Sequence, residues 1–87
     1  MLIALDYDGT YTKDPALWNQ FIIDAVAAGH RIVTVTMRGP RAALTVPMEV
    51  FYTGGTPKAD YVKAQGLKVD IWIDDDPWLI HHPPERF

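Results

Sequence analysis

The sequence predicts an α/β fold built on a parallel sheet, and three observations lead to this prediction. Short apolar runs alternate with amphipathic segments along the 87 residues, which is the pattern of strands joined by helices. Proline, glycine and capping residues mark where these segments begin and end. Acidic side chains follow the first and the last apolar run, and ligands of parallel sheets bind beyond the carboxyl ends of the strands.

The N-terminal part of the chain predicts a strand, a helix and a second strand. Leu2–Leu5 is apolar and short, as expected of a buried strand. Asp14 can cap a helix that has Pro15 in its first turn, and Gly29 ends it. Residues 31–36 are rich in β-branched side chains and predict the second strand. The apolar residues that recur at helical spacing are Leu17, Trp18, Phe21, Ile22, Ala25 and Val26.

The middle of the chain predicts a break and then a third strand. One or two helical turns are expected over residues 40–44, and Pro47 rules out a long helix there. Glu49–Tyr52 is expected to form a short strand, which Gly54 and Gly55 stop.

The C-terminal part predicts a helix, a strand and a short closing helix. Thr56 can cap a helix that has Pro57 in its first turn and that runs to about Gln65. Residues 69–73 are expected to form the last strand, and residues 78–80 a short helix before the polar tail.

These elements combine most simply into one small domain over residues 1–87. We expect a Rossmann-like three-layer arrangement with about four parallel strands and the first strand central. At this length only about 60–65% of the unfolded chain's surface becomes buried, so we hypothesise that homo-oligomerisation or bound metal adds stability. The aromatic residues expected in the core are Trp18, Phe21, Phe51 and Trp72.

Composition excludes several classes of function. A net charge of -3 and a pI near 5.4 argue against strong nucleic-acid binding. The chain contains no cysteine, so disulfides, zinc thiolate sites and cysteine catalysis are excluded. No signal peptide and no apolar run of membrane-spanning length is visible. We therefore expect a cytoplasmic protein without membrane contacts.

Two acidic groups at predicted strand ends are the main functional signal. Asp6 and Asp8 follow the first strand, and residues 74–76 are three aspartates after the last one. Like charges held together are costly, and a divalent cation removes that cost; oxygen ligands favour Mg²⁺ or Ca²⁺. The chemistry this suggests is phosphoryl transfer. The alternative is that Asp6 and Asp8 only shape a turn and that the aspartate trio is a solvated loop.

Four elements in order resemble the haloacid dehalogenase (HAD) superfamily of phosphohydrolases over nearly the whole chain. The first is the apolar strand that ends in Asp6-Tyr7-Asp8-Gly9-Thr10. The second is the strand that ends in Thr36, followed by Met37-Arg38. Lys58 is the third, and the final strand that ends in Asp74-Asp75 is the fourth.

The resemblance implies a role for each residue of the first motif. Asp6 would attack phosphorus and form an aspartyl-phosphate, and it would also bind Mg²⁺. Asp8 would act as general acid and then as general base, with its backbone carbonyl reaching the metal. Gly9 and Thr10 would shape the loop that receives the substrate.

The resemblance also implies roles for the later motifs. Thr36 would donate a hydrogen bond to a phosphoryl oxygen, and Lys58 would neutralise charge on Asp6 and on the transferring group. Of the last acids, we favour Asp75 as the direct metal ligand and Asp74 as a second or water-mediated one. Asp76 would lie on the rim.

Several residues have competing interpretations. Thr34 lies on the same strand face as Thr36, which we prefer because it ends the strand. Lys63 and Lys68 are the alternatives to Lys58. We prefer Lys58 because a lysine in the first turn of a helix interacts unfavourably with the helix dipole, so its presence there suggests a functional role. Arg38 either clamps an anionic group of the substrate or is an ordinary surface arginine. His81 and His82 invite a metal interpretation. A histidine pair in a polar tail is more often simply exposed to solvent.

The segments 10–15 and 39–49 are too short to hold the cap domain that many members of this superfamily carry, so we expect an open active site. The function predicted is that of a Mg²⁺-dependent phosphomonoester hydrolase acting on a phosphorylated substrate of unknown identity. One alternative is a phosphate-accepting signalling module similar to receiver domains, in which the order of motifs differs. The other is a catalytically weak metal-binding protein on the same scaffold.

Overall fold

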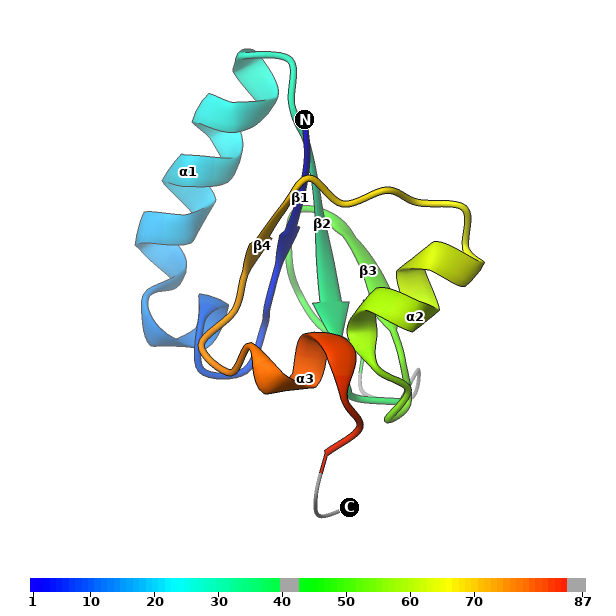
Figure 1. Ribbon diagram of the computed structural model, residues 1–87. Coiled ribbons are helices and arrows are strands. Elements are labelled where there is room, and N and C mark those ends of the chain that lie inside the picture. The colour runs from blue at the N-terminus through cyan, green and yellow to red at the C-terminus, as the bar shows by residue number, and fades with distance from the viewer. Residues whose placement is uncertain (40–42, 85–87) are drawn as a thin grey trace.

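The computed structural model describes residues 1–39 and 43–84 and confirms the predicted α/β class (Figure 1). Its sheet has four strands, all of them parallel, and helices pack against it. The elements in chain order are β1 Leu2–Leu5, the 3-10 helix η1 Tyr11–Lys13, α1 Pro15–Ala27, β2 Arg31–Thr36, β3 Glu49–Tyr52, α2 Lys58–Ala64, β4 Ile71–Ile73 and α3 Trp78–His81.

The strand order is β3-β2-β1-β4, so β1 lies between β2 and β4. Ile3 pairs with Ile32 on one side and with Ile71 on the other. The first and the last strand of the chain are therefore neighbours. Because all strands run in the same direction, their carboxyl ends meet at one edge of the sheet, the lower edge in Figure 1.

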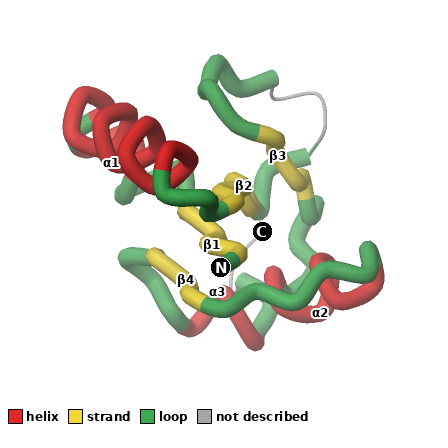
Figure 2. The backbone as a smooth tube through the Cα atoms, turned by 90° about the horizontal axis from the view of Figure 1, so that it is seen from above, coloured by secondary structure: helices red, strands yellow, loops and turns green. Residues whose placement is uncertain are grey.

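Apolar side chains form two clusters, and strand alternation places these on opposite faces of the sheet. Ile3 and Leu5 pack with Ile22 of α1 in one cluster. Ala4 packs with Val62 of α2 in the other. Figure 2 accordingly shows α1 on one side of the strands and α2 with α3 on the other. The four aromatic residues expected in the core are only half-buried and pack at the margins of these clusters: Trp18, Phe21, Phe51 and Trp72.

Helix α1 begins as predicted, but its apolar residues are not all buried. The Asp14 carboxylate accepts a hydrogen bond from the backbone N–H of Leu17 at 3.2 Å, and Pro15 is in the first turn. Gly29 has a φ of 90°, the conformation expected after a helix end. Leu17 and Val26 are each 56% exposed, because they flank the stripe that faces the sheet.

Two boundaries in the C-terminal half were predicted wrongly. Helix α2 begins one residue after Pro57, which occupies the N-cap position with extended backbone. None of the described side chains caps the helix. The predicted Thr56 cap is therefore wrong. The last strand spans only Ile71–Ile73 and not residues 69–73. Just before it, the backbone N–H of Asp70 donates to the carbonyl oxygen of Leu2 at 2.9 Å, and the Asp70 carboxylate accepts the backbone N–H of Leu2 at 2.7 Å.

The helical turns expected over residues 40–44 fall largely outside the described residues, and Ala43 and Leu44, which are described, are not helical. The short closing helix expected over residues 78–80 is present as α3, which packs on α2. Across residues 1–39 and 43–84, no helix is long and apolar enough to cross a membrane.

Candidate active site

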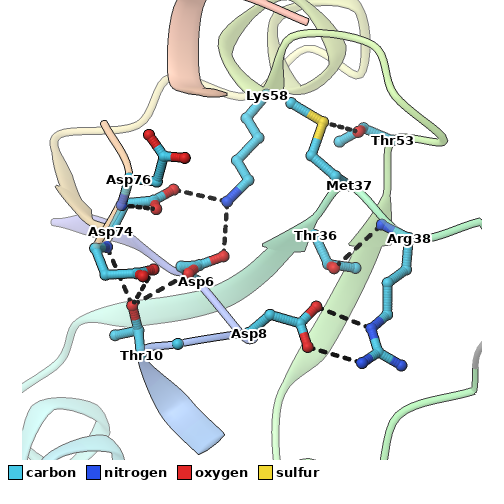
Figure 3. Close-up of polar contacts among 12 residues, drawn as sticks. Asp6, Asp8, Thr10, Thr36, Met37, Arg38, Thr53, Lys58, Asp74 and Asp76 are labelled. Carbon is cyan, nitrogen blue, oxygen red and sulfur yellow. Dashed lines mark hydrogen bonds and ion pairs between the residues drawn. The ribbon is translucent and has the colours of Figure 1, made fainter. Parts of the chain in front are cut away.

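The pairing of β1 with β4 brings the two acidic groups of the sequence together. Asp6 follows β1, and its backbone N–H donates a hydrogen bond to the carbonyl oxygen of Ile73 at 2.9 Å. Asp74 is the next residue after Ile73. Asp6 and Asp74 thus lie side by side at the carboxyl edge of the sheet (Figure 3).

Lys58 lies between these two carboxylates. Its ammonium donates hydrogen bonds to Asp6 at 2.7 Å and to Asp74 at 2.6 Å, and Figure 3 shows it pointing into the gap between them. The Lys58 side chain is only 2% exposed, and those of Asp6 and Asp74 are 8% and 2% exposed. Three buried charges here are paired and hydrogen-bonded, as buried charges must be. The other lysines considered, Lys63 and Lys68, are exposed and make no such contact in the described part of the chain.

The Thr10 hydroxyl connects the two acidic groups on the other side of Asp6. It lies 3.1 Å from a carboxylate oxygen of Asp6 and 3.2 Å from one of Asp75, and it accepts the backbone N–H of Asp75 at 3.2 Å. A hydroxyl has one proton, so it donates to one of these carboxylates at a time. Thr10 therefore holds Asp75 at a fixed position beside Asp6.

Gly9 is required at its position for two reasons. Its φ is 82°, in the left-handed region that side chains rarely adopt. A Cβ atom built on Gly9 would lie 2.9 Å from the carboxylate carbon of Asp75. The close approach of the β1 loop to Asp75 thus depends on the absence of a side chain.

Asp6, Asp74 and Asp75 form a group suited to a metal ion. One carboxylate oxygen from each lies within 4.8 Å of the other two. Burial raises the pKa of Asp6 to about 7; hydrogen bonding with Asp75 acts in the same direction and Lys58 opposes both. The more exposed Asp75 has its pKa lowered, chiefly by that same hydrogen bond with Asp6. The single positive charge of Lys58 therefore does not compensate the negative charges of the three carboxylates. An additional cation would compensate them.

The Asp8 side chain lies apart from this group. Its carboxylate accepts two hydrogen bonds from the Arg38 guanidinium, from Nε at 2.9 Å and from Nη2 at 2.7 Å, and this contact raises the pKa of Arg38. The guanidinium lies over the Tyr7 ring, 5.4 Å from its centroid. Figure 3 shows the carboxylate turned away from Asp6 and toward Arg38. Of the four predicted metal-binding residues, the structure brings together the carboxylates of Asp6, Asp74 and Asp75. The contact predicted for Asp8 runs through its backbone carbonyl and stays a prediction.

Thr36 lies at the end of β2 beside the same site. It is 1% exposed, and its hydroxyl oxygen accepts the backbone N–H of Arg38 at 3.3 Å. Thr34 is fully buried, and its hydroxyl has no hydrogen-bond partner among the described residues. Thr36 lines the cavity next to the acids and Thr34 does not, so the structure separates two residues that strand periodicity leaves equivalent.

A cavity of about 170 Å³ lies over these residues. Its lining also includes two apolar residues, Met37 and Leu79, which no pattern in the sequence marks as part of a site. A larger groove of about 570 Å³ runs beside α1, but its described lining contains no carboxylate, amine or imidazole, so it is not the candidate site. The residues that line the smaller cavity are Asp6, Asp8, Thr36, Met37, Lys58, Asp74, Asp75, Asp76 and Leu79.

The histidine pair takes no part in the acidic group. His81 ends α3, and the ring of His82 stacks on Trp78 with 3.6 Å between centroids. Among the described residues, the group able to hold a metal consists of aspartates only.

Comparison of the chain with models of protein families, with curated proteins and with solved structures found no match.

Proposed function

We propose that this protein is a Mg²⁺-dependent phosphomonoester hydrolase that works through an aspartyl-phosphate on Asp6. The observation that carries the proposal is the contact of Asp6 with Lys58, Asp74 and Asp75 at the carboxyl edge of the sheet. The order of motifs that resembles the HAD superfamily supports the same function. A cytoplasmic location is part of the proposal, since the chain contains no cysteine.

The residues present fit a magnesium ion. Carboxylate oxygens are the ligands that Mg²⁺ prefers, and Asp6, Asp74 and Asp75 offer three of them within 4.8 Å of one another. Both oxygens of Asp74 already accept hydrogen bonds, from Lys58 and from the backbone of Asp76. Asp75 is more exposed, so it is the preferred direct ligand. When bound, Mg²⁺ supplies Lewis-acid stabilisation of charge on the phosphoryl oxygens.

In the first step, a carboxylate oxygen of Asp6 attacks phosphorus. A new bond forms between Asp6 and phosphorus, and the bond from phosphorus to the ester oxygen breaks. The leaving oxygen takes the proton of Asp8, which acts as general acid. Lys58 and the Thr36 hydroxyl offset the negative charge that gathers on Asp6 and on the phosphoryl oxygens.

In the second step, a water molecule attacks the same phosphorus. Asp8, now a carboxylate, takes a proton from this water. The bond between phosphorus and Asp6 breaks, so inorganic phosphate leaves and Asp6 returns to its initial state. No co-reactant other than water is needed.

The size of the cavity constrains the substrate. Pockets that enclose a drug-sized ligand measure about 300–1,000 Å³, whereas this cavity measures about 170 Å³. It accommodates the phosphoryl group but not a large leaving group, which would lie outside on the rim. Bulky phosphorylated molecules are therefore compatible with the site.

The proposal is tested by hydrolysis of p-nitrophenyl phosphate with Mg²⁺. We expect Asp6→Asn to lower kcat by at least about a thousandfold, because it removes the nucleophile. Asp8→Asn should lower kcat about 10²- to 10⁴-fold, as expected for a general acid. The control is Asp60→Asn, an exposed acid on α2, which should leave turnover unchanged.

Other outcomes would favour the alternatives. A long-lived phosphoprotein formed on Asp6 would indicate a phosphate-accepting signalling module. Absence of turnover together with absence of stabilisation by Mg²⁺ would reject the hydrolase and leave only the scaffold.

A further inference from the structure

The bidentate contact between Asp8 and Arg38 conflicts with the role that Asp8 has in the proposed reaction. A general acid must present a carboxyl oxygen to the leaving group. Both oxygens of Asp8 instead accept hydrogen bonds from Arg38, at 2.7 and 2.9 Å. Asp8 can reach a leaving group only after this contact opens.

Arg38 is placed to exchange partners. Its side chain is 46% exposed, and that of Asp8 is 54% exposed, so solvent and solutes reach the pair. The backbone N–H of Arg38 is fixed to Thr36 at 3.3 Å, and Thr36 and Asp8 line the cavity that holds Asp6. The guanidinium therefore lies at the rim, where the leaving group of a substrate would project. Its fork of N–H donors matches carboxylate and phosphate groups equally well.

We propose that Arg38 determines specificity for substrates whose leaving group carries a second anionic group, either a carboxylate or a phosphate. This group would take the place of the Asp8 carboxylate on Arg38. Asp8 would then take a proton from water and turn toward the ester oxygen, to which it gives that proton. The inference depends on the proposed function, since it assigns the substrate class of the same site. Arg38 is a binding and positioning residue in this scheme, and the reacting atoms are those of Asp6, Asp8 and the substrate.

The energetic basis is that the exchange replaces one ion pair with another of the same kind. A bidentate arginine-carboxylate pair is stronger than an ordinary exposed ion pair, so opening it without a replacement loses two charge-assisted hydrogen bonds. A leaving group without an anion opens the pair with no replacement, whereas a leaving group with an anion restores both hydrogen bonds. The advantage should appear in kcat as well as in KM, because it releases Asp8 for the chemical step.

The test compares glycerol 3-phosphate with 3-phosphoglycerate, which differ in a hydroxymethyl group and a carboxylate, with Mg²⁺ present. We expect the wild-type kcat/KM to be at least about tenfold higher for 3-phosphoglycerate, and this ratio to fall as ionic strength rises. Arg38→Gln should bring the ratio to about one. The same ratio of kcat/KM is measured for propane-1,3-diol bisphosphate and propane-1,3-diol monophosphate, which differ by a second phosphate. Comparison of this ratio with the one for the carboxylate pair shows which second anionic group is preferred.

The matched control is Arg31→Gln. Arg31 forms an exposed ion pair with Glu49 at 2.7 Å, but at the start of β2, at the opposite edge of the sheet. This variant should keep the wild-type ratio. Binding of the two non-hydrolysable phosphonate analogues, measured by calorimetry with Mg²⁺, gives a readout independent of turnover and should show the same preference.

The outcomes separate this inference from the proposed function. Hydrolysis of p-nitrophenyl phosphate with equal kcat/KM for the matched substrates would overturn the role of Arg38 and leave the hydrolase intact. A preference that survives in Arg38→Gln would overturn it as well. Absence of hydrolysis of every ester would reject the proposed function, and equal binding of the two phosphonates would then reject the role of Arg38 separately.

Discussion

Lys58 is the residue on which the acidic group depends in the absence of a cation. Its ammonium is buried between the carboxylates of Asp6 and Asp74. Because Lys58 is the first residue of α2, these two ion pairs join that helix to the ends of β1 and β4. Removal of one partner from a buried ion pair leaves an uncompensated charge, which is far more costly than the loss of an exposed pair.

We predict that Lys58→Met lowers the free energy of unfolding by about 3–5 kcal/mol without Mg²⁺. Saturating Mg²⁺ should recover part of this loss, because the cation takes over compensation of Asp6 and Asp74. Urea unfolding with and without Mg²⁺ measures both effects. Lys63→Met, an exposed substitution in the last turn of the same helix, should change stability little. Equal losses in the two variants would contradict the prediction.

A second prediction separates the two reasons for glycine at position 9. Gly9 and Gly66 have φ values of 82° and 78°, so alanine at either position costs about 1 kcal/mol of backbone strain. Only at Gly9 does the new Cβ approach Asp75, whereas at Gly66 no atom of residues 1–39 and 43–84 lies within 4 Å of it. Gly9→Ala should therefore lose more stability than Gly66→Ala and should also weaken Mg²⁺ binding by calorimetry. Unchanged Mg²⁺ affinity in Gly9→Ala would show that Asp75 is not a ligand.

At the scale of elements, α1 is the longest helix described, and a single side chain caps its start. The Asp14 carboxylate accepts the backbone N–H of Leu17, and a lost cap of this kind costs about 1 kcal/mol. We predict that Asp14→Ala lowers the thermal midpoint by several degrees. The control is Asp24→Ala near the end of the same helix, where an acid opposes the dipole. Relief of this effect offsets loss of the exposed hydrogen bond from Gln20, so stability should change little. A larger loss in the control would contradict the assignment of the cap.

The elements show why part of the site could be predicted from sequence. The carboxyl ends of parallel strands meet at one edge, so Asp6, Asp74 and Asp75 are expected at that edge once the strands are identified. Their close approach depends in addition on the pairing of β1 with β4. The contact of Asp8 with Arg38 depends instead on side-chain rotamers at the ends of two different strands. The Thr56 cap was wrong because local pattern alone does not decide where a chain leaving a glycine turn first becomes helical.

At the scale of the whole molecule, the buried acidic group should make stability depend on pH. The pKa of Asp6 is about 7 in the folded state, against an ordinary value near 3.9 in the unfolded chain. Between these values the folded protein holds a proton that the unfolded chain has lost. Stability therefore decreases as pH rises from about 4 to about 7. The lowered pKa of Asp75 acts in the opposite direction, and only below about pH 4.

We predict that Asp6→Asn removes this decrease, so the difference in unfolding free energy between the variant and the wild type grows from pH 5 to pH 7. The slope should not exceed about 1.4 kcal/mol per pH unit. Saturating Mg²⁺ should stabilise the wild type more at pH 8 than at pH 5, since it binds the ionised carboxylate. Urea titrations at fixed pH values measure both quantities. A difference that does not vary with pH would show that Asp6 titrates normally.

The neighbouring position of β1 and β4 has a consequence for synthesis of the chain. Thr10 and Asp75 touch although 65 residues separate them in sequence. A nascent chain that has delivered β1, β2 and β3 from the ribosome still lacks the strand that carries the remaining acids. The centre is thus completed only after β4 and the aspartates that follow it have been synthesised, and a product that ends before them holds Asp6 without Asp74 and Asp75.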